Sequence, residues 1–239
     1  MIDYAKKLSF FQMLGRIVRE KGIFYFAIKT FYKLIFPIYL KIVGKRTFIF
    51  KNKKLVYFNH SYNAALANER AVEISICLDF ISNSQKILEI GNVLSHYVPI
   101  NWEVLDKYEP GKGVINEDVV AFKSNSKYDL IVSVSTFEHI GFDEKIKDVD
   151  KPKKALQHLR KFLTKKGVLV ITIPYGWNPD LDKMILNKEI LFNELFVFKR
   201  ISWGNIWIKT KLENLKNVKY GKPYIGANGL IVGVIKNGN

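Results

Sequence analysis

The sequence predicts an α/β fold with a doubly wound, mostly parallel sheet of seven strands, an antiparallel C-terminal edge and an N-terminal appendage of helices and a hairpin. From residue 64 to residue 174, short apolar β-rich segments alternate with segments of helical periodicity, which is typical of parallel strands joined by crossovers. Residues 195–201 and 229–235 are two further β-rich segments with no clear helix near the chain end. These indicate an antiparallel pair at a sheet edge.

Length and composition allow one sizeable domain plus an appendage, since the chain has 239 residues and 48% of them are hydrophobic. Of the net charge of +16, most lies in residues 1–56, which hold 13 Lys or Arg and two acids. Only six of the 38 basic residues are arginine, which argues against a dedicated nucleic-acid binder. The single cysteine, Cys77, excludes an internal disulfide framework and favours a reducing, cytoplasmic location.

Residues 23–43 have the length of a membrane span, but they contain Lys29, Lys33 and Lys41 and are interrupted by Pro37. On a helical projection the apolar side chains form one stripe, and the first two lysines lie on another. Three interpretations remain open: the stripe packs on the main domain, docks on an anionic inner membrane surface, or forms a subunit interface.

The remaining elements follow in order along the chain. Residues 47–50 and 55–58 flank a turn-forming segment and predict a hairpin, after which we place the boundary between an appendage, residues 1–60, and the main domain, residues 61–239. A helix after Asp150 is predicted to end at Gly167. The other expected elements are a helix over 64–81 and strands over 86–90, 102–105, a short segment before 116, 128–134 and 168–174.

An acid stands at or just after the carboxyl end of each of the first three strands of the main domain: Glu89, Asp106 and Asp118. Ligands of open parallel sheets bind beyond these strand ends. Asp106 suits the hydroxyls of a ribose and Asp118 the exocyclic amine of adenine. The alternative, that an acid ends a strand only because loops are polar, remains open for any one of them.

The loop after the first of these strands, in KILEIGNVLSHY, has one glycine, Gly91. A pyrophosphate needs backbone amides lined by glycine at a helix start, but Val93 and Ser95 stand where further glycines would be. A cofactor with ribose and adenine but no phosphates fits this pattern better.

Several motifs together resemble a class I S-adenosylmethionine-dependent methyltransferase with a Rossmann-like fold, of the type that acts on small molecules and sugars (methyltransferase type 11-like). They are EIG after the first strand, an acid after the second, NED after the third, YDLIVSVSTFEHIG at the fourth, GVLVITIPYG at the fifth, and NERAVEI in the leading helix. The resemblance covers roughly residues 65–235. It implies S-adenosylmethionine as the cofactor.

Carried over by position, the resemblance implies that Glu89 and Gly91 border the methionine part of the cofactor. Asp106 would bind the ribose and Asp118 the adenine amine. The other positions implied to contact the cofactor or to line the transfer site are Val119 and the segment from Ser135 to His139.

Methyl transfer to a hydroxyl benefits from a general base, and His139 is the best-placed candidate because an unperturbed histidine titrates near neutral pH. Glu138 is the second catalytic candidate, as a group that orients the cofactor or His139. A structural histidine and a solvated acid are the alternatives. Tyr175, Trp177 and Asn178 follow the fifth strand and suit a sugar or a similar polar ring, although a turn also explains them.

The sequence therefore predicts O-methylation of a saccharide, a glycan precursor or another small polar acceptor. We expect a cytoplasmic protein with peripheral contact to the inner membrane surface through residues 1–56. No metal site is expected, because four scattered histidines and one cysteine give no ligand spacing. Two alternatives remain: an RNA methyltransferase that uses the basic N-terminal segment, and a non-catalytic assembly protein with this fold.

Overall fold

The structure is a computed structural model that describes residues 46–238 together with residues 30, 34, 35 and 38. The chain divides into two compact units, residues 1–46 and residues 47–239. The predictions on the amphipathic segment of residues 23–43 lie largely outside the described residues. In the described part of the chain, no helix has the length and apolar character needed to cross a membrane.

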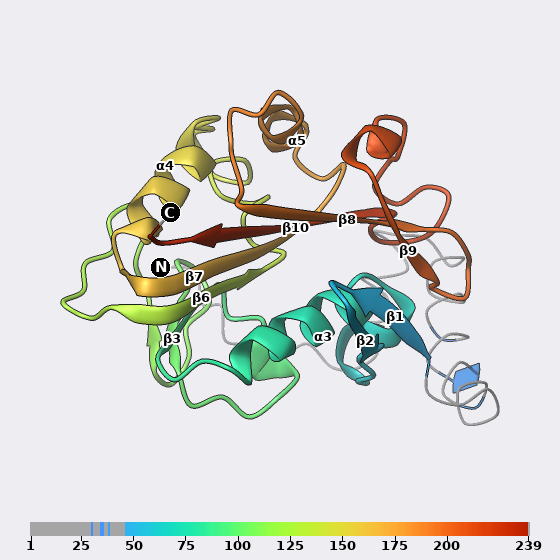
Figure 1. Cartoon of the computed structure of the whole chain (residues 1–239), viewed down its shortest axis with the longest axis horizontal. Coiled ribbons are helices and arrows are strands. Elements are labelled where there is room, and N and C mark those ends of the chain that lie inside the picture. The colour runs from blue at the N-terminus through green and yellow to red at the C-terminus, as the bar shows by residue number, and fades with distance from the viewer. Residues whose placement is uncertain (1–29, 31–33, 36–37, 39–45, 239) are drawn as a thin grey trace, which may run out of the picture. The chain divides into compact units, whose positions relative to one another are not determined.

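The second unit is built on an eight-stranded sheet with the order β5-β4-β3-β6-β7-β10-β8-β9 (Figure 1). The five strands from β5 to β7 are parallel, and β10 and β9 run antiparallel to their neighbours. The strands are β3 (Ile87–Ile90), β4 (Glu103–Leu105), β5 (Val114–Ile115), β6 (Tyr128–Val134), β7 (Leu163–Pro174), β8 (Glu194–Arg200), β9 (Trp207–Thr210) and β10 (Gly229–Lys236).

The α/β class and the mostly parallel sheet are confirmed, but the C-terminal half of the sheet differs from the prediction. The sheet has eight strands and not seven, because the short segment of β9 pairs with β8 as an additional edge. The last strand, β10, does not lie at the edge but between β7 and β8. Its residues Gly229 to Ile235 are all buried, as a strand covered on both faces must be.

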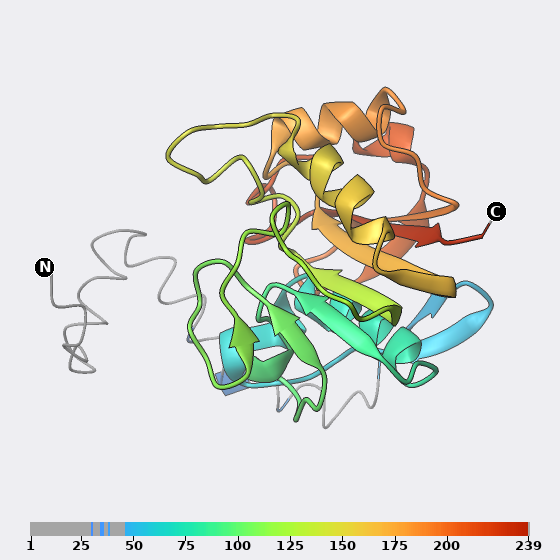
Figure 2. The same cartoon turned by 90° about the vertical axis from the view of Figure 1, so that its left-hand side faces the viewer.

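Helices cover both faces of the sheet (Figures 1 and 2). The helix α3 (Arg70–Ile81) lies on one face, and α4 (Lys151–Arg160) and α5 (Pro179–Leu186) lie on the other. Within residues 46–238 there are also three short 3₁₀ turns: η1 (Tyr62–Ala67), η2 (Leu94–His96) and η3 (Leu212–Leu215).

Two predicted helix limits were wrong. The first long helix begins at Arg70 and not near residue 64, because Asn63 and Ala64 have positive φ angles of 49° and 48°. The helix after Asp150 starts as expected but ends at Arg160. Gly167 instead lies inside β7, where a Cβ atom would come within 2.7 Å of the Tyr128 carbonyl oxygen. This glycine permits a close approach of strands and does not end a helix.

The predicted hairpin is present, formed by β1 (Thr47–Phe50) and β2 (Lys53–Val56), although its second strand begins two residues earlier than expected. It belongs to the same compact unit as the sheet. The Phe48 ring packs edge-on against Phe198 of β8, with centroids 6.0 Å apart. The second unit therefore begins at Thr47, whereas the sequence placed the boundary near residue 60.

The strand order reverses between β3 and β6. From β3 the chain goes outward through β4 to β5, and it then returns to pair β6 with the other side of β3. Ligands of doubly wound sheets bind at such a switch point, beyond the carboxyl ends of the strands. The loops that follow β3, β4, β5 and β6 meet there.

Candidate functional site

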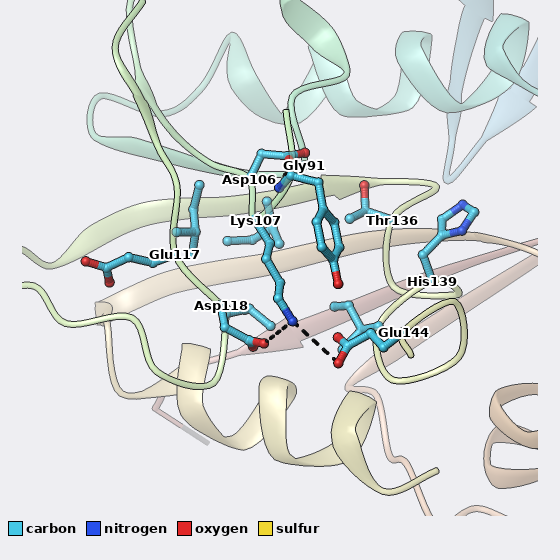
Figure 3. A pocket seen from close by; sticks show the side chains of 13 residues that line it. Gly91, Asp106, Lys107, Glu117, Asp118, Thr136, His139 and Glu144 are labelled. Atoms are coloured by element: carbon cyan, nitrogen blue, oxygen red, sulfur yellow. Dashed lines mark hydrogen bonds and ion pairs between the residues drawn. The ribbon is translucent and has the colours of Figure 1, made fainter. Parts of the chain in front are cut away.

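A pocket opens at the switch point, beyond β3, β4 and β6 (Figure 3). It holds about 480 Å³ of space, part of which is open to solvent. Its apolar lining comes from Ile90, Leu105, Val119 and Ile140, and its polar lining includes Asp106, Lys107, Asp118, His139 and Glu144. This lining suits a ligand with an apolar part and several hydrogen-bonding groups.

The Glu89 side chain fixes the conformation of the loop after β3. This side chain is fully buried, and its Oε1 accepts hydrogen bonds from the backbone N–H groups of Val93 and Leu94, at 2.9 and 2.7 Å. Its Oε2 accepts from the indole N–H of Trp102 at 3.0 Å. Burial raises the pKa of Glu89, against the effect of these donors. Glu89 does not line the pocket, so it shapes the loop rather than the ligand surface.

Gly91 brings the loop backbone against the end of β6. Its φ angle is +85°, and a Cβ atom at this position would lie 2.2 Å from the Thr136 hydroxyl oxygen. Both the backbone conformation and the lack of space therefore require glycine here. The close contact brings the ends of β3 and β6 together at the floor of the pocket.

Asp106, at the end of β4, organises the neighbouring backbone. Its Oδ2 accepts from the N–H of Asn92 at 3.0 Å, and its Oδ1 accepts from the N–H groups of Tyr108 and Glu109 at 2.8 and 2.7 Å. A carboxylate has about four acceptor positions, so one remains on Oδ2. Asp106 lines the pocket and can accept one further hydrogen bond there.

Asp118 belongs to a network of two acids and two lysines. The ammonium groups of Lys107 and Lys151 lie 2.8 and 2.6 Å from its Oδ2. Lys151 also lies 2.6 Å from Glu144, and Lys107 lies 3.5 Å from it. Burial acts to raise the pKa of Asp118, but the hydrogen bonds from the two lysines prevail and lower it to about 2. Figure 3 shows Lys107 extending across the pocket to reach both acids.

His139 forms a hydrogen bond with Asp143 within the loop after β6. Its Nδ1 lies 2.5 Å from the Asp143 carboxylate, and its Nε2 lies 3.7 Å from Oε1 of Glu138. When Nδ1 carries the proton toward Asp143, Nε2 is left as a proton acceptor. The Nδ1 contact thus fixes both the ring orientation and the tautomer required of a general base.

Glu138 is buried between this loop and the body of the domain. It is 2% exposed, and its Oε2 has no hydrogen-bond partner. Burial raises its pKa well above the usual range, and the nearby Glu73 adds to the effect. A buried carboxyl oxygen without a partner costs free energy, so this atom is suited to a group that a ligand supplies.

Ser135 does not line the pocket. Its hydroxyl donates to Oε1 of Glu73 at 2.6 Å, and its φ angle is +42°. The same Oε1 accepts from the Thr172 hydroxyl at 2.8 Å, and Oε2 lies 3.0 Å from the Arg70 guanidinium. Glu73 thus joins helix α3 to the ends of β6 and β7, and Ser135 is one of its anchors.

The three residues predicted at the acceptor side have different environments. The Asn178 side chain caps α5 by accepting from Asp180 and Leu181, and its amide also donates to the Glu138 carbonyl oxygen. Tyr175 is 6% exposed. The Trp177 ring packs edge-on to His139 and to Tyr220, and its buried Nε1 has no hydrogen-bond partner. Of the three, Trp177 is the one with a buried polar atom that lacks a partner, and none of the three lines the pocket.

The structure therefore brings five of the predicted residues into one pocket: Gly91, Asp106, Asp118, Val119 and His139. The other predicted residues lie outside its lining: Glu89, Ser135, Glu138, Tyr175, Trp177 and Asn178. Sequence reasoning missed Asp143, although a spacing of four residues from His139 is a usable signal. It also missed Lys107, which directly follows Asp106. Glu144 and Lys151 carry no such signal, because their positions depend on how the loop after β6 packs against α4.

Among the described residues no cluster of His, Cys, Asp or Glu could hold a metal ion.

Several solved structures that are similar to this chain are methyltransferases. The N-methyltransferase NodS from Bradyrhizobium japonicum, in complex with S-adenosyl-L-homocysteine, gives a TM-score of 0.46 at 13% identity, over 72% of this chain and 88% of that one. An S-adenosylmethionine-dependent methyltransferase from Clostridium acetobutylicum gives 0.37 at 15% identity, over 70% and 89%. A possible histamine N-methyltransferase from Thermotoga maritima gives 0.39 at 12% identity, over 96% of each chain.

No protein-family model and no curated protein sequence matches the chain. The TM-scores above lie below 0.5, and similarity at that level does not establish a shared fold. The assignment of the fold depends on the strand order and register of this chain.

Proposed function

We propose that the protein transfers a methyl group from S-adenosylmethionine to a small polar acceptor. The observation that carries this proposal is the pocket at the switch point, where the Gly91 loop, Asp106 and Asp118 follow three successive strands of the sheet. The bound S-adenosyl-L-homocysteine in the NodS structure is consistent with it. The strand order favours a ligand site at this edge of the sheet, and the side chains there favour a nucleoside as the ligand.

The pocket suits a nucleoside without phosphates. The backbone N–H groups of Asn92, Val93 and Leu94 already donate to Asp106 and Glu89, so they are not available to a pyrophosphate. Lys107, which lines the pocket, and Lys151 beside it are balanced by Asp118 and Glu144. A dinucleotide would therefore find neither free amides nor uncompensated positive charge at this place.

The expected contacts follow from the groups that remain available. Val119 and Ile140 offer an apolar surface to an adenine ring, and Asp118 accepts from its amine once Lys107 moves aside. The remaining acceptor position of Asp106 suits a ribose hydroxyl. Gly91 permits the backbone to approach the methionine part. Glu89 acts by holding the loop in shape.

The cofactor supplies an electrophilic methyl group on a sulfonium. The protein has to bring the acceptor oxygen into line with it and remove a proton. His139 is suited to take that proton at Nε2, because Asp143 holds the ring by Nδ1. Asp143 is a positioning residue in this account, and Glu138 lies beside the same nitrogen.

We propose a saccharide or a related polyhydroxylated molecule as the acceptor. Two buried polar atoms without partners, Glu138 Oε2 and Trp177 Nε1, lie on residues that flank His139. One is suited to a donor and the other to an acceptor, and neighbouring hydroxyls of a sugar offer both. Trp177 and Tyr220 add aromatic surface of the kind that binds sugar rings.

The test is a transfer assay with methyl-labelled S-adenosylmethionine and a panel of mono- and oligosaccharides, with amines and RNA as comparison acceptors. We expect label in an O-methyl sugar, with turnover lost in Trp177→Phe and retained in Trp203→Phe. Trp203 lies in the turn between β8 and β9, is 53% exposed and does not line the pocket. Label in an amine or in RNA, with none in any saccharide, would contradict the choice of acceptor.

A further inference from the structure

The edge hairpin of β8 and β9 exposes a stripe of isoleucines on one face. Lys199 is paired with Ile208 across the two strands, and the N–H of Ile201 donates to the Ile206 carbonyl oxygen at 2.9 Å. Side chains at alternate positions share a face, so Ile201, Ile206 and Ile208 lie together with Lys199. The three isoleucines are 44–45% exposed, which is unusual for this residue type on a sheet.

The turn that carries this stripe is fixed to the domain. Asn205 is fully buried; its amide donates to the carbonyl oxygens of Leu66 and Asn68 at 2.9 and 2.8 Å, and its Oδ1 accepts from the indole N–H of Trp207 at 2.7 Å. The exposure of the isoleucines is therefore a property of an ordered turn.

The same face continues into a groove between these strands, α5 and η3. Val197 and Thr210, which face each other in the register, line this groove together with Leu191 and Leu195. Leu191 is 71% exposed and Leu195 38%. We call Leu191, Leu195, Ile201, Ile206 and Ile208 the β8–β9 face. In the sheet, β8 and β9 lie on the far side of β7 and β10 from β3 (Figure 1). The pocket is lined by residues at and after the ends of β3, β4, β5 and β6, so this face is separate from the candidate site.

Positive charge surrounds the β8–β9 face. Lys199 shares this face, whereas the register places Arg200 and Lys209 on the opposite face of the strands. Lys188, Lys211 and Lys216 line the groove, where Glu213 is the one acid in its lining. A second copy of the chain on this face would bring these lysines close to one another, which disfavours self-association through it.

We propose that the β8–β9 face docks the protein on an anionic lipid bilayer. Aliphatic side chains on an ordered turn suit the boundary between headgroups and acyl chains, and lysines around them reach lipid phosphates with their ammonium groups. A single Lys near an anionic surface contributes only a small attraction, so the apolar and charged contributions are both needed. The proposal is independent of the methyl transfer reaction.

The test is co-sedimentation of the full chain with vesicles of phosphatidylcholine alone and of phosphatidylcholine with phosphatidylglycerol. We expect binding to the anionic vesicles only, and a loss of at least fivefold in the bound fraction when Ile201, Ile206 and Ile208 are all changed to serine. The matched control changes three aliphatic residues of similar or greater exposure, Ile49, Ile146 and Val149, to serine and is expected to bind as the wild type does.

A second variant, Lys199→Gln with Lys211→Gln, keeps the apolar face and removes charge. It is expected to weaken binding at low salt and to differ little from the wild type at high salt. Equal sedimentation of the triple isoleucine variant and the wild type, with unchanged melting temperatures, would overturn the proposal. A concentration-dependent dimer that this variant abolishes would also overturn it, because a second copy would then cover the face.

Discussion

The Lys107 ammonium lies 2.8 Å from the Asp118 carboxylate, across the pocket in which we place the adenine ring. Lys151 contacts the same oxygen from the side of α4 and is far more buried, with 9% of its side chain exposed against 36% for Lys107. Lys107 is therefore the partner that a ligand displaces, and Lys151 is the one that stays.

We predict that Lys107→Met strengthens the binding of S-adenosylmethionine by about two- to fivefold, because a partly exposed ion pair worth up to about 1 kcal/mol no longer has to be broken. Calorimetric titration at low and high salt measures this. Wild-type affinity should improve as salt screens the pair, and the variant should respond less. Lys112→Met is the control. Weaker binding by Lys107→Met would mean that this ammonium contacts the cofactor itself.

We predict that Glu89→Gln destabilises the domain by roughly 1–3 kcal/mol. The two Glu89 oxygens accept from three N–H donors, and an amide would turn a donor group toward one of them. Urea unfolding of both proteins measures the difference, with the exposed Glu117→Gln as the control. An unchanged midpoint for Glu89→Gln would show that the loop is held in some other way.

The pH dependence of stability tests the effect of burial on the pKa of Asp182. Burial raises its pKa to about 7, against the effect of the Gly176 N–H that donates to it at 2.8 Å. Since the folded state holds this proton more tightly than the unfolded chain, the contribution to stability is complete below pH 4 and is lost as the pH rises to about 7. The slope reaches about 1.4 kcal/mol per pH unit for one proton.

We predict that Asp182→Asn removes this pH-dependent contribution to stability. The unfolding free energy of the variant therefore falls less between pH 5 and pH 7 than that of the wild type. Chemical unfolding of both proteins across this range measures it, and Asp180→Asn, on the exposed side of α5, serves as the control. Parallel plots of unfolding free energy against pH for Asp182→Asn and the wild type would contradict a raised pKa at Asp182.

For the reaction we predict that His139→Ala lowers kcat by about 10²- to 10⁴-fold, as expected when a general base is removed. Asp143→Asn should lower kcat by a smaller factor and leave the Kd of S-adenosylmethionine unchanged, because it acts only through the His139 ring. Rapid-mixing turnover and calorimetry separate the two quantities. A changed Kd with an unchanged kcat in Asp143→Asn would mean that this pair shapes the pocket and takes no part in proton transfer.

Much of the pocket could be predicted from the sequence because parallel strands end at one edge of the sheet. Once the strands were placed, Asp106, Asp118 and Gly91 had to lie near one another. The partners of these residues could not be predicted in the same way. Lys151 reaches Asp118 across 33 residues, and Glu73 reaches Ser135 across 62, through contacts that depend on how helices pack on the sheet.

Two local signals were present but were not used. Asn178-Pro179-Asp180 is a helix start, with an amide cap followed by proline in the first turn, and it explains why Asn178 is occupied in capping α5. The fully apolar segment of β10 indicated an interior strand and not an edge. By contrast, the four residues of β9 mix apolar and cationic side chains, so only pairing with β8 identifies them as a strand.

The most direct test of the central claim is calorimetric titration of the wild type and Asp118→Ala with S-adenosylhomocysteine, alongside NAD. The account predicts micromolar binding of S-adenosylhomocysteine, a loss of at least tenfold, about 1.4 kcal/mol, in Asp118→Ala, and no binding of NAD. Binding of NAD in preference to S-adenosylhomocysteine, or no binding of either by the folded wild type, would contradict it.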